Sequence, residues 1–328
     1  MSFDVPSKTV RLVEKYRPST WEDVVGHEDI VSSVRNILGR HGTIPQFMFL
    51  GNPGIGKTTI AHLIGKTLGC DVIEFNASDD RGIDFIRGDV KRLSEYSVQR
   101  VVILDEAEKL TNDAQHALRR TMENTPATIF ILIGNDESLF IDAIKSRCAI
   151  YRFAPLPDIA VRDKILDIIN KEGFKLDLST EEKKEAIRKA IIVLVDRSNG
   201  DMRAAINNLE KIITQDGTIT PESVVVLGQP LNILASIQMA LKGDFESGRD
   251  MLETEYIEKG FDSRLVFKDI YRSLKRIDNR THRIRLFEKL GEIEDHVKRG
   301  SDPLIQLTCF IAFAWKMPHL VKCPVLEK

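Results

Sequence analysis

The chain has 328 residues, 42% of them hydrophobic and 29% charged, with a formal net charge of −2. This length predicts two or three domains, because a single core rarely grows so large. The charge is lower than that of many proteins that act alone on nucleic acid. Apolar runs stay far below the ~20 residues of a membrane-spanning helix, and the N-terminus lacks a secretory signal. We therefore expect an intracellular protein that does not act at a membrane.

The cysteines also argue against an extracellular scaffold. The four of them are scattered along the chain without a close pair. Zinc sites and disulfide frameworks need clustered ligands, so reduced and mostly buried thiols are expected.

The first half of the chain alternates between strand and helix patterns. Helical patterns cover residues 57–68, 83–96 and 113–123. Short apolar runs separated by such helices are typical of a parallel sheet buried on both faces, hence an α/β fold. The expected strands are residues 47–50, 72–75, 101–104, 129–133 and 150–153.

Beyond Pro155-Leu-Pro157 the pattern becomes helical, over residues 158–172, 180–197 and 201–215. Asp158, Thr180 and Asp201 are the expected N-caps of these helices. A second break falls near Gly228-Gln-Pro230, and only helical periodicity follows it. The predicted domains are residues 1–156, 157–228 and 229–328.

A phosphate-binding motif follows the first strand. Gly51-Asn-Pro-Gly54-Ile-Gly56-Lys57-Thr58 matches G-x-x-x-x-G-K-[ST] between a strand and a helix, as that motif requires. The glycines let backbone N–H groups face a phosphate, and the following helix adds its positive end. We expect Lys57 to reach the β- and γ-phosphates and Thr58 to bind Mg²⁺.

Two carboxylates follow the third strand, and one amide follows the fourth. Asp105 is expected beside the P-loop, where it would hold Mg²⁺, and Glu106 would polarise the attacking water. This pair favours an ATP hydrolase over a kinase or a GTPase, and the N-K-x-D motif that reads guanine is absent. Asn135 is placed to contact the γ-phosphate or the water, although an asparagine after a strand is more often a turn residue.

The ordered set of motifs resembles the small subunits of replication factor C over nearly the whole chain. These motifs are Val13-Glu-Lys-Tyr-Arg-Pro18, Asp23-Val-Val-Gly26, Asn76-Ala-Ser-Asp-Asp-Arg-Gly-Ile-Asp84, Asp105-Glu-Ala-Glu108, Ala114-Gln-His-Ala-Leu-Arg-Arg-Thr-Met-Glu123, Ser146-Arg-Cys148 and Gly200-Asp-Met-Arg203. The resemblance implies a P-loop AAA+ ATPase core, a helical lid and an all-α collar. Five such subunits would form an open ring that uses ATP to load a sliding clamp onto primer–template DNA.

The resemblance also assigns roles to single residues. It implies that Tyr16, Arg17, Pro18, Val24 and Val25 line the adenine, and that Arg203 acts as a sensor carried by the lid. Together with the P-loop, the expected ATP contacts are Val13, Tyr16, Arg17, Val24, Val25, Gly51, Asn52, Pro53, Gly54, Ile55, Gly56, Lys57, Thr58, Thr59, Asn135 and Arg203.

Further arginines are assigned to neighbouring molecules. Arg147 resembles an arginine finger that reaches the ATP of the adjacent subunit; a surface salt bridge is the alternative. Contacts to the DNA backbone, without sequence preference, are implied for basic residues on two helices; plain exposed charge is the alternative. Those basic residues are Arg81, Arg87, Lys91, Arg119 and Arg120.

Three positions depart from the family pattern. Leu12 stands where tryptophan is frequent, Glu108 where aspartate is common, and Gly134 where alanine or cysteine is usual. None of them removes a catalytic group.

Two other functions remain open from the sequence. The chain could be a structural subunit that holds ATP with little turnover, although the intact Glu106 speaks against this. It could also be a AAA+ helicase such as a Holliday-junction motor, a class that typically ends in a winged-helix domain. The helical periodicity after residue 231 favours a collar instead.

Overall fold

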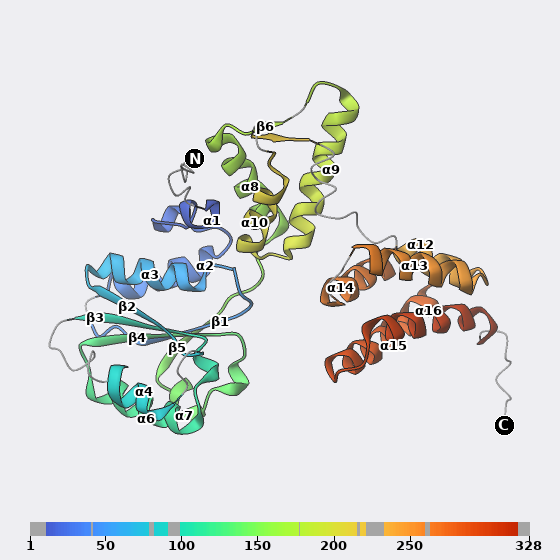
Figure 1. Cartoon of the computed structure of the whole chain (residues 1–328). Helices are drawn as coiled ribbons and strands as arrows, with labels where there is room; N and C mark the ends of the chain where they lie inside the picture. The colour runs from blue at the N-terminus through green and yellow to red at the C-terminus, as the bar shows by residue number, and fades with distance from the viewer. Residues whose placement is uncertain are drawn as a thin grey trace, which may run out of the picture. The chain divides into compact units, whose positions relative to one another are not determined.

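The computed structural model describes residues 11–40, 42–78, 82–90, 99–176, 178–214, 217–220, 233–259 and 263–320. The chain forms two compact units, Met1–Leu227 and Gly228–Lys328 (Figure 1). Each unit has its own hydrophobic core residues.

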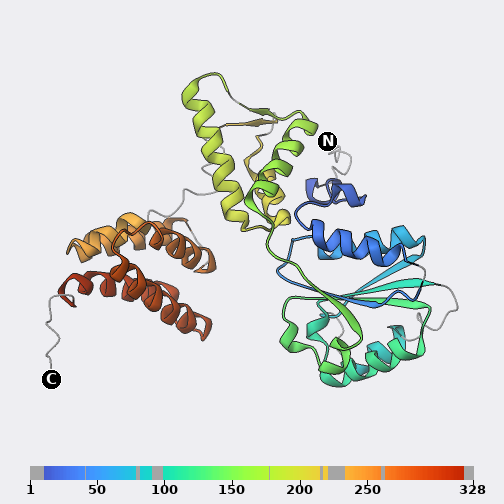
Figure 2. The ribbon, with the colours of Figure 1, turned by 180° about the vertical axis from the view of Figure 1, so that it is seen from behind.

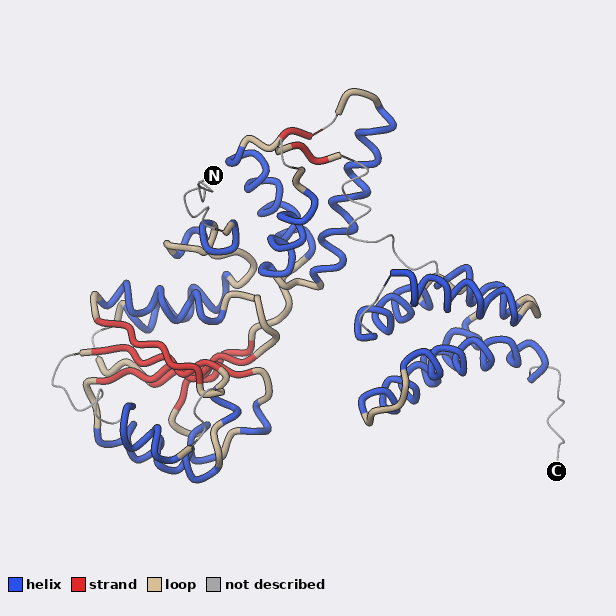
Figure 3. The backbone as a smooth tube through the Cα atoms, in the orientation of Figure 1, coloured by secondary structure: helices blue, strands red, loops and turns tan. Residues whose placement is uncertain are grey.

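A five-stranded parallel sheet forms the centre of the first unit, in the order β2-β3-β4-β1-β5. Its inner strands are buried almost throughout because helices cover both faces, as the continuous apolar runs predicted. The strands are seen edge-on between two helical layers in Figure 3. Their bounds are β1 Gln46–Leu50, β2 Asp71–Asn76, β3 Arg100–Asp105, β4 Thr128–Gly134 and β5 Cys148–Arg152.

The two faces of this sheet carry different helices (Figure 1). On one face, α2 (Glu28–Leu38) and α3 (Lys57–Leu68) pack against the odd-numbered side chains of β1 and β3, such as Phe47. On the other face, α4 (Ile83–Phe85), α6 (Asn112–Asn124) and α7 (Asp142–Lys145) pack against the alternate side chains, such as Met48. Alternation along each strand therefore builds two cores from one sheet.

Short helical turns connect these elements. They are η1 Trp21–Asp23, the π-helical η2 Ile86–Val90, η3 Ala107–Lys109 and η4 Glu137–Leu139. The helical stretch expected over residues 83–96 is helical in its described part, where one α-helical turn passes directly into the π-helical η2, and residues 91–98 lie outside the described residues.

After Leu156 the chain builds a smaller layer around α8 (Asp158–Glu172), α9 (Glu181–Ser198) and α10 (Met202–Ile212). This layer is not purely helical as expected, because β6 (Lys175–Leu176) and β7 (Thr218–Ile219) form a two-stranded parallel sheet. The N-terminal helix α1 (Leu12–Lys15) packs against the same core. The prediction that residues 157–228 form a separate domain is not tested by these observations.

The expected helix caps hold in two of three cases. Thr180 accepts a hydrogen bond from the Lys183 N–H (3.2 Å), and Asp201 accepts one from the Ala204 N–H (2.8 Å). Asp158 is not an N-cap; it is the first helical residue, because Pro157 occupies the cap position. An acidic residue there still suits the positive end of the helix.

The second unit consists of helices in its described part, which Figure 2 shows from behind. They surround a core that includes Ile270, Leu286 and Phe310. These helices are α12 Ile233–Leu241, α13 Phe245–Lys259, α14 Ser263–Leu274, α15 Arg280–Lys298 and α16 Pro303–Leu320. Among the described residues of the whole chain, none of the helices has the length and apolar character to cross a bilayer.

The thiols are less buried than expected. Cys70 and Cys148 are free and half-buried, and Cys309 is free and exposed. Cys323 lies outside the described residues.

Candidate active site

The P-loop connects the end of β1 to the start of α3. Gly51, Gly54 and Gly56 all have positive φ, at 142°, 72° and 102°, a region that favours glycine. Space also excludes a side chain, because a Cβ on Gly51 would lie 2.4 Å from the carbonyl oxygen of Phe153. The loop therefore curls tightly and brings the N-terminus of α3 to the mouth of a pocket.

Lys57 is held inside this loop. Its side chain is only 7% exposed, and its Nζ donates to the carbonyl oxygens of Gly51 (2.5 Å) and Asn52 (2.6 Å). Burial lowers the pKa of Lys57, and the carboxylates of Asp105 and Glu108 partly oppose that shift. The Lys57 ammonium therefore lies within electrostatic reach of the Asp105 and Glu108 carboxylates.

The end of β3 supplies the acidic side of the pocket. Asp105 Oδ2 accepts from the Thr58 hydroxyl (3.3 Å), and Asp105 Oδ1 accepts from the Glu106 N–H (2.8 Å). Glu106 adopts a left-handed conformation (φ 54°), unusual for a residue with a side chain, and its carboxylate pairs with Lys109. A hydroxyl and a carboxylate adjacent to a phosphate loop are the ligand set that Mg²⁺ uses when phosphates and water complete its shell.

Asn135, directly after β4, closes this side of the site. Its Oδ1 accepts from Lys57 Nζ at 3.5 Å, the long end of hydrogen-bond distance. Its backbone N–H (3.2 Å) and its Nδ2 (2.9 Å) both donate to Oε1 of Glu108. Asn135 therefore bridges the P-loop lysine and the turn that follows β3.

Helix α10 also contacts the P-loop. The Met202 N–H donates to the carbonyl oxygen of Gly54 (3.0 Å), and a Cβ on Gly54 would lie 1.8 Å from Oδ1 of Asp201. Burial raises the pKa of Asp201, although it caps α10 and feels the charges of Arg203 and Lys57. Arg203 itself lines the pocket.

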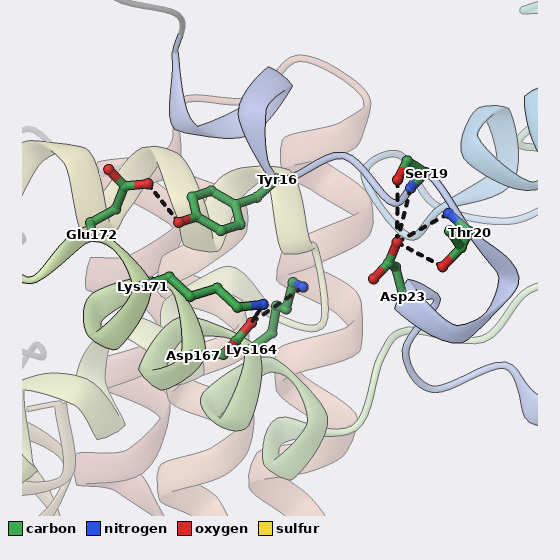
Figure 4. Close-up of polar contacts among 8 residues, drawn as sticks. All are labelled: Tyr16, Ser19, Thr20, Asp23, Lys164, Asp167, Lys171 and Glu172. Carbon is green, nitrogen blue, oxygen red and sulfur yellow. Dashed lines mark hydrogen bonds and ion pairs between the residues drawn. The ribbon is translucent and has the colours of Figure 1, made fainter.

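The N-terminal segment forms the remaining wall, and its contacts to α8 are drawn in Figure 4. The Tyr16 hydroxyl donates to Oε1 of Glu172 (2.5 Å), and Lys15 forms an ion pair with the same oxygen (2.6 Å). Burial and the hydrogen bond to Glu172 raise the pKa of Tyr16 to about 12. Asp23 accepts hydrogen bonds from the Thr20 N–H (3.0 Å) and hydroxyl (2.9 Å), which shapes the turn.

One pocket gathers most of the residues expected to contact nucleotide. The exceptions are Gly51 and Asn52, which do not line it but hold Lys57 through their carbonyls. The lining residues are Val13, Tyr16, Arg17, Pro18, Asp23, Val24, Val25, Pro53, Gly54, Ile55, Gly56, Lys57, Thr58, Thr59, Asp105, Glu106, Asn135, Leu156, Lys164, Met202, Arg203 and Ile206.

Several of these pocket-lining residues were not predicted from the sequence, among them Lys164 on α8 and Ile206 on α10. Ile206 could have been found, because it lies three residues after Arg203 and shares its helix face. Lys164 carries no motif, and only the packing of α8 reveals it.

Among the described side chains, Arg119, Arg120 and Arg147 do not line this pocket. Arg147 follows α7, where it pairs with Glu123 of α6 and donates to the carbonyl oxygen of Ala143 (2.8 Å). Arg119 and Arg120 lie on α6. Arg81 and Lys91 are outside the described residues, and Arg87 lies in η2, where its backbone alone is described.

These features define a P-loop ATPase of the AAA class. A model described as "ATPase family associated with various cellular activities" matches residues 47–156, and one described as "Replication factor C C-terminal domain" matches residues 229–312.

Curated relatives and solved structures narrow the class. The replication factor C small subunit of Natronomonas pharaonis is 37% identical, covering 92% of this chain and 93% of that protein. The one from Staphylothermus marinus is 39% identical, covering 91% and 92%. The chain therefore belongs to the replication factor C small subunit family, and it functions as a clamp-loader subunit in DNA replication.

Among solved structures, the RuvB Holliday junction branch migration motor of Thermotoga maritima matches with a TM-score of 0.54 at 18% identity, covering 75% of this chain and 86% of that one. A single-residue variant of the same protein gives 0.55 at 17% identity, over 75% and 86%. At this identity the likeness concerns the fold alone. The matched C-terminal domain model supports the loader over the motor.

Proposed function

We propose that this chain binds ATP with Mg²⁺ in the pocket described above and hydrolyses it with help from the adjacent subunit. One observation carries the proposal: two hydrogen-bonded pairs, Lys57 with Asn135 and Thr58 with Asp105, line one pocket that Arg203 also lines. Lys57 and Arg203 neutralise phosphate charge from opposite sides, one from the core and one from α10.

Thr58 and Asp105 would hold the magnesium ion, and a bound Mg²⁺ neutralises charge on the β- and γ-phosphates. Glu106 follows Asp105 at the edge of the pocket and is the general base that orients water. Its pairing with Lys109 fixes the carboxylate on one side. Asn135 presents its amide oxygen toward Lys57 and so senses the γ-phosphate end of the site.

Arg147 is proposed to act on the nucleotide of the neighbouring subunit. Its support is position: the guanidinium does not line its own chain's pocket, and its side chain stays 35% exposed although it pairs with Glu123. A planar, permanently charged group suits the charge that develops in phosphoryl transfer.

The assembly is proposed to be a five-membered ring with other loader subunits, formed inside the cell through residues 229–328 as a collar. Residues 1–156 would be the ATPase domain and residues 157–228 the lid. The ring would open a sliding clamp and place it on primer–template DNA. The proposed backbone contacts are Arg81, Arg87, Lys91, Arg119 and Arg120.

The test is ATP hydrolysis by the reconstituted complex, with and without clamp and primed DNA. Stimulation by both together, without strand separation, is expected for a loader. Robust unwinding of a duplex would contradict the proposal in favour of a helicase. Turnover that does not respond to Glu106→Gln would contradict the catalytic assignment while leaving the family unchanged.

A further inference from the structure

Glu108 lies outside the nucleotide pocket, yet two of its contacts fix a residue inside it. Oε1 of Glu108 accepts from both the backbone N–H and Nδ2 of Asn135, at 3.2 and 2.9 Å. Because both donors belong to one residue, they fix the Asn135 backbone and the rotation of its amide together. The amide oxygen is thereby left facing Lys57.

The second oxygen of Glu108 has a different environment. Oε2 is buried and has no hydrogen-bond partner among the described residues. It occupies the space beside Gly134, where a Cβ would lie 2.9 Å from it and 2.8 Å from Cε2 of Phe140. Gly134 does not have a positive φ, so the backbone conformation does not require glycine. A Cβ at this position would instead force the Glu108 carboxylate or the Phe140 ring to shift.

The two departures from the family pattern therefore complement each other. A glutamate is longer than an aspartate by one methylene, about 1.5 Å, and this length carries its carboxylate to the end of β4. The missing side chain at Gly134 leaves the room that the carboxylate occupies. An alanine at residue 134 would press on both the Glu108 carboxylate and the Phe140 ring, so that these side chains would have to shift, whereas a shorter acid would leave that room unfilled.

We propose that Glu108 is a positioning residue for Asn135 and that Gly134 is its steric complement. Glu108 does not line the nucleotide pocket; it acts by holding the Asn135 amide in the orientation that reads the γ-phosphate end of the site. The inference rests on the proposed role of Asn135. We expect Glu108 to affect the rate of ATP hydrolysis more than the affinity for nucleotide, because the P-loop supplies most of the phosphate contacts.

The experiment compares variants of the full chain in the reconstituted complex, by kcat for ATP hydrolysis and by Kd for ADP. Glu108→Ala is expected to lower kcat on the order of 10- to 100-fold, the range for a slightly misplaced catalytic group. The Kd for ADP should stay within about twofold, since the α- and β-phosphates lie at the P-loop. Glu137→Ala is the matched control: this carboxylate also lies near the end of β4, but it pairs with Arg152.

A double-mutant cycle separates positioning from a structural role. Glu108→Ala combined with Asn135→Ala should be no slower than Asn135→Ala alone. Gly134→Ala should lower kcat by a smaller factor when it is introduced into the Glu108→Asp variant than when it is introduced into the parent chain. If the double variant lost kcat by the product of the two single-variant losses, the inference would be overturned. It would also be overturned if Glu108→Ala weakened ADP binding by the same factor as it lowered kcat.

Failure of the inference is distinguishable from failure of the proposed function. If Asn135→Ala leaves kcat unchanged, the sensor role of Asn135 is wrong. If Asn135→Ala lowers kcat but Glu108→Ala does not, the sensor stands and the positioning role falls. Should Glu108→Ala unfold, the pair Gly134→Ala and Glu108→Asp still tests the steric complement.

Discussion

The contact between Tyr16 and Glu172 gives a prediction that can be worked out from the structure. Changing Tyr16 to phenylalanine keeps the ring in the pocket wall and removes the hydroxyl that donates to Glu172. Hydrogen bonds to charged groups contribute about 1.5–3 kcal/mol. Lys15 still pairs with Glu172, so the carboxylate keeps a partner, and we expect a loss of about 1 kcal/mol.

Such a loss is measurable by calorimetry of the full chain. For a unit of this size, 1 kcal/mol corresponds to a Tm decrease of about 2–4 °C. The transition of the Met1–Leu227 unit is recognised because ADP raises it, since a ligand stabilises the folded state that binds it. Tyr271→Phe, in the other unit, is the control and should leave this transition in place.

The pH dependence gives a second test of the same contact. The pKa of Tyr16 rises from its ordinary value of 10.0 to about 12 in the folded chain. The neutral hydroxyl therefore contributes stability that is fully present below pH 10 and is lost as the pH rises toward 12. The stability difference between the parent chain and Tyr16→Phe should shrink over that window. An unchanged Tm for Tyr16→Phe, or a difference that stays constant from about pH 9 to 12, would refute this reasoning.

Three further predictions concern the pocket and its surroundings. Lys57→Ala should abolish measurable ATP binding, checked by titration with a fluorescent ATP analogue; retained binding would contradict its role. Arg147→Ala should lower turnover on the order of 10³-fold in the complex without changing the ATP affinity of its own chain, and equal loss of that affinity would place the finger in cis. Gly54→Ala should lower the Tm through its positive φ and its collision with Asp201, and it should lower the Tm by less in an Asp201→Ala background, measured against Asp201→Ala alone because that change also removes the N-cap of α10; an equal decrease in both backgrounds would show that φ alone decides.

The sequence predicted the sheet well for a physical reason. Central parallel strands are buried on both faces, so the runs that form β1, β3 and β4 are continuously apolar and easy to recognise. The P-loop was equally accessible, since its glycines meet local conformational needs that are written into neighbouring residues.

What the sequence could not predict depends on packing between distant segments. Strands of two residues, such as β6 and β7, carry no periodic signal. Lys164 reaches the pocket only because α8 is placed beside the N-terminal segment. Glu108 and Gly134 were each recognised as departures, but nothing in their separation along the chain indicates that they share one space.

Hydrogen bonds around the pocket connect the N-terminal segment, α8, α10 and the P-loop to one another. Tyr16 is bound to α8, the Leu12 N–H donates to Glu210 of α10 (2.6 Å), and α10 is bound to the P-loop through Met202. The nucleotide pocket thus lies among three segments that already contact one another at its rim. If ATP draws Arg203 toward its phosphates, as proposed above, we expect α10 and α1 to shift together, because Glu210 of α10 accepts a hydrogen bond from Leu12 of α1. A ligand moves such a contact only by binding one arrangement of the rim more tightly than the other.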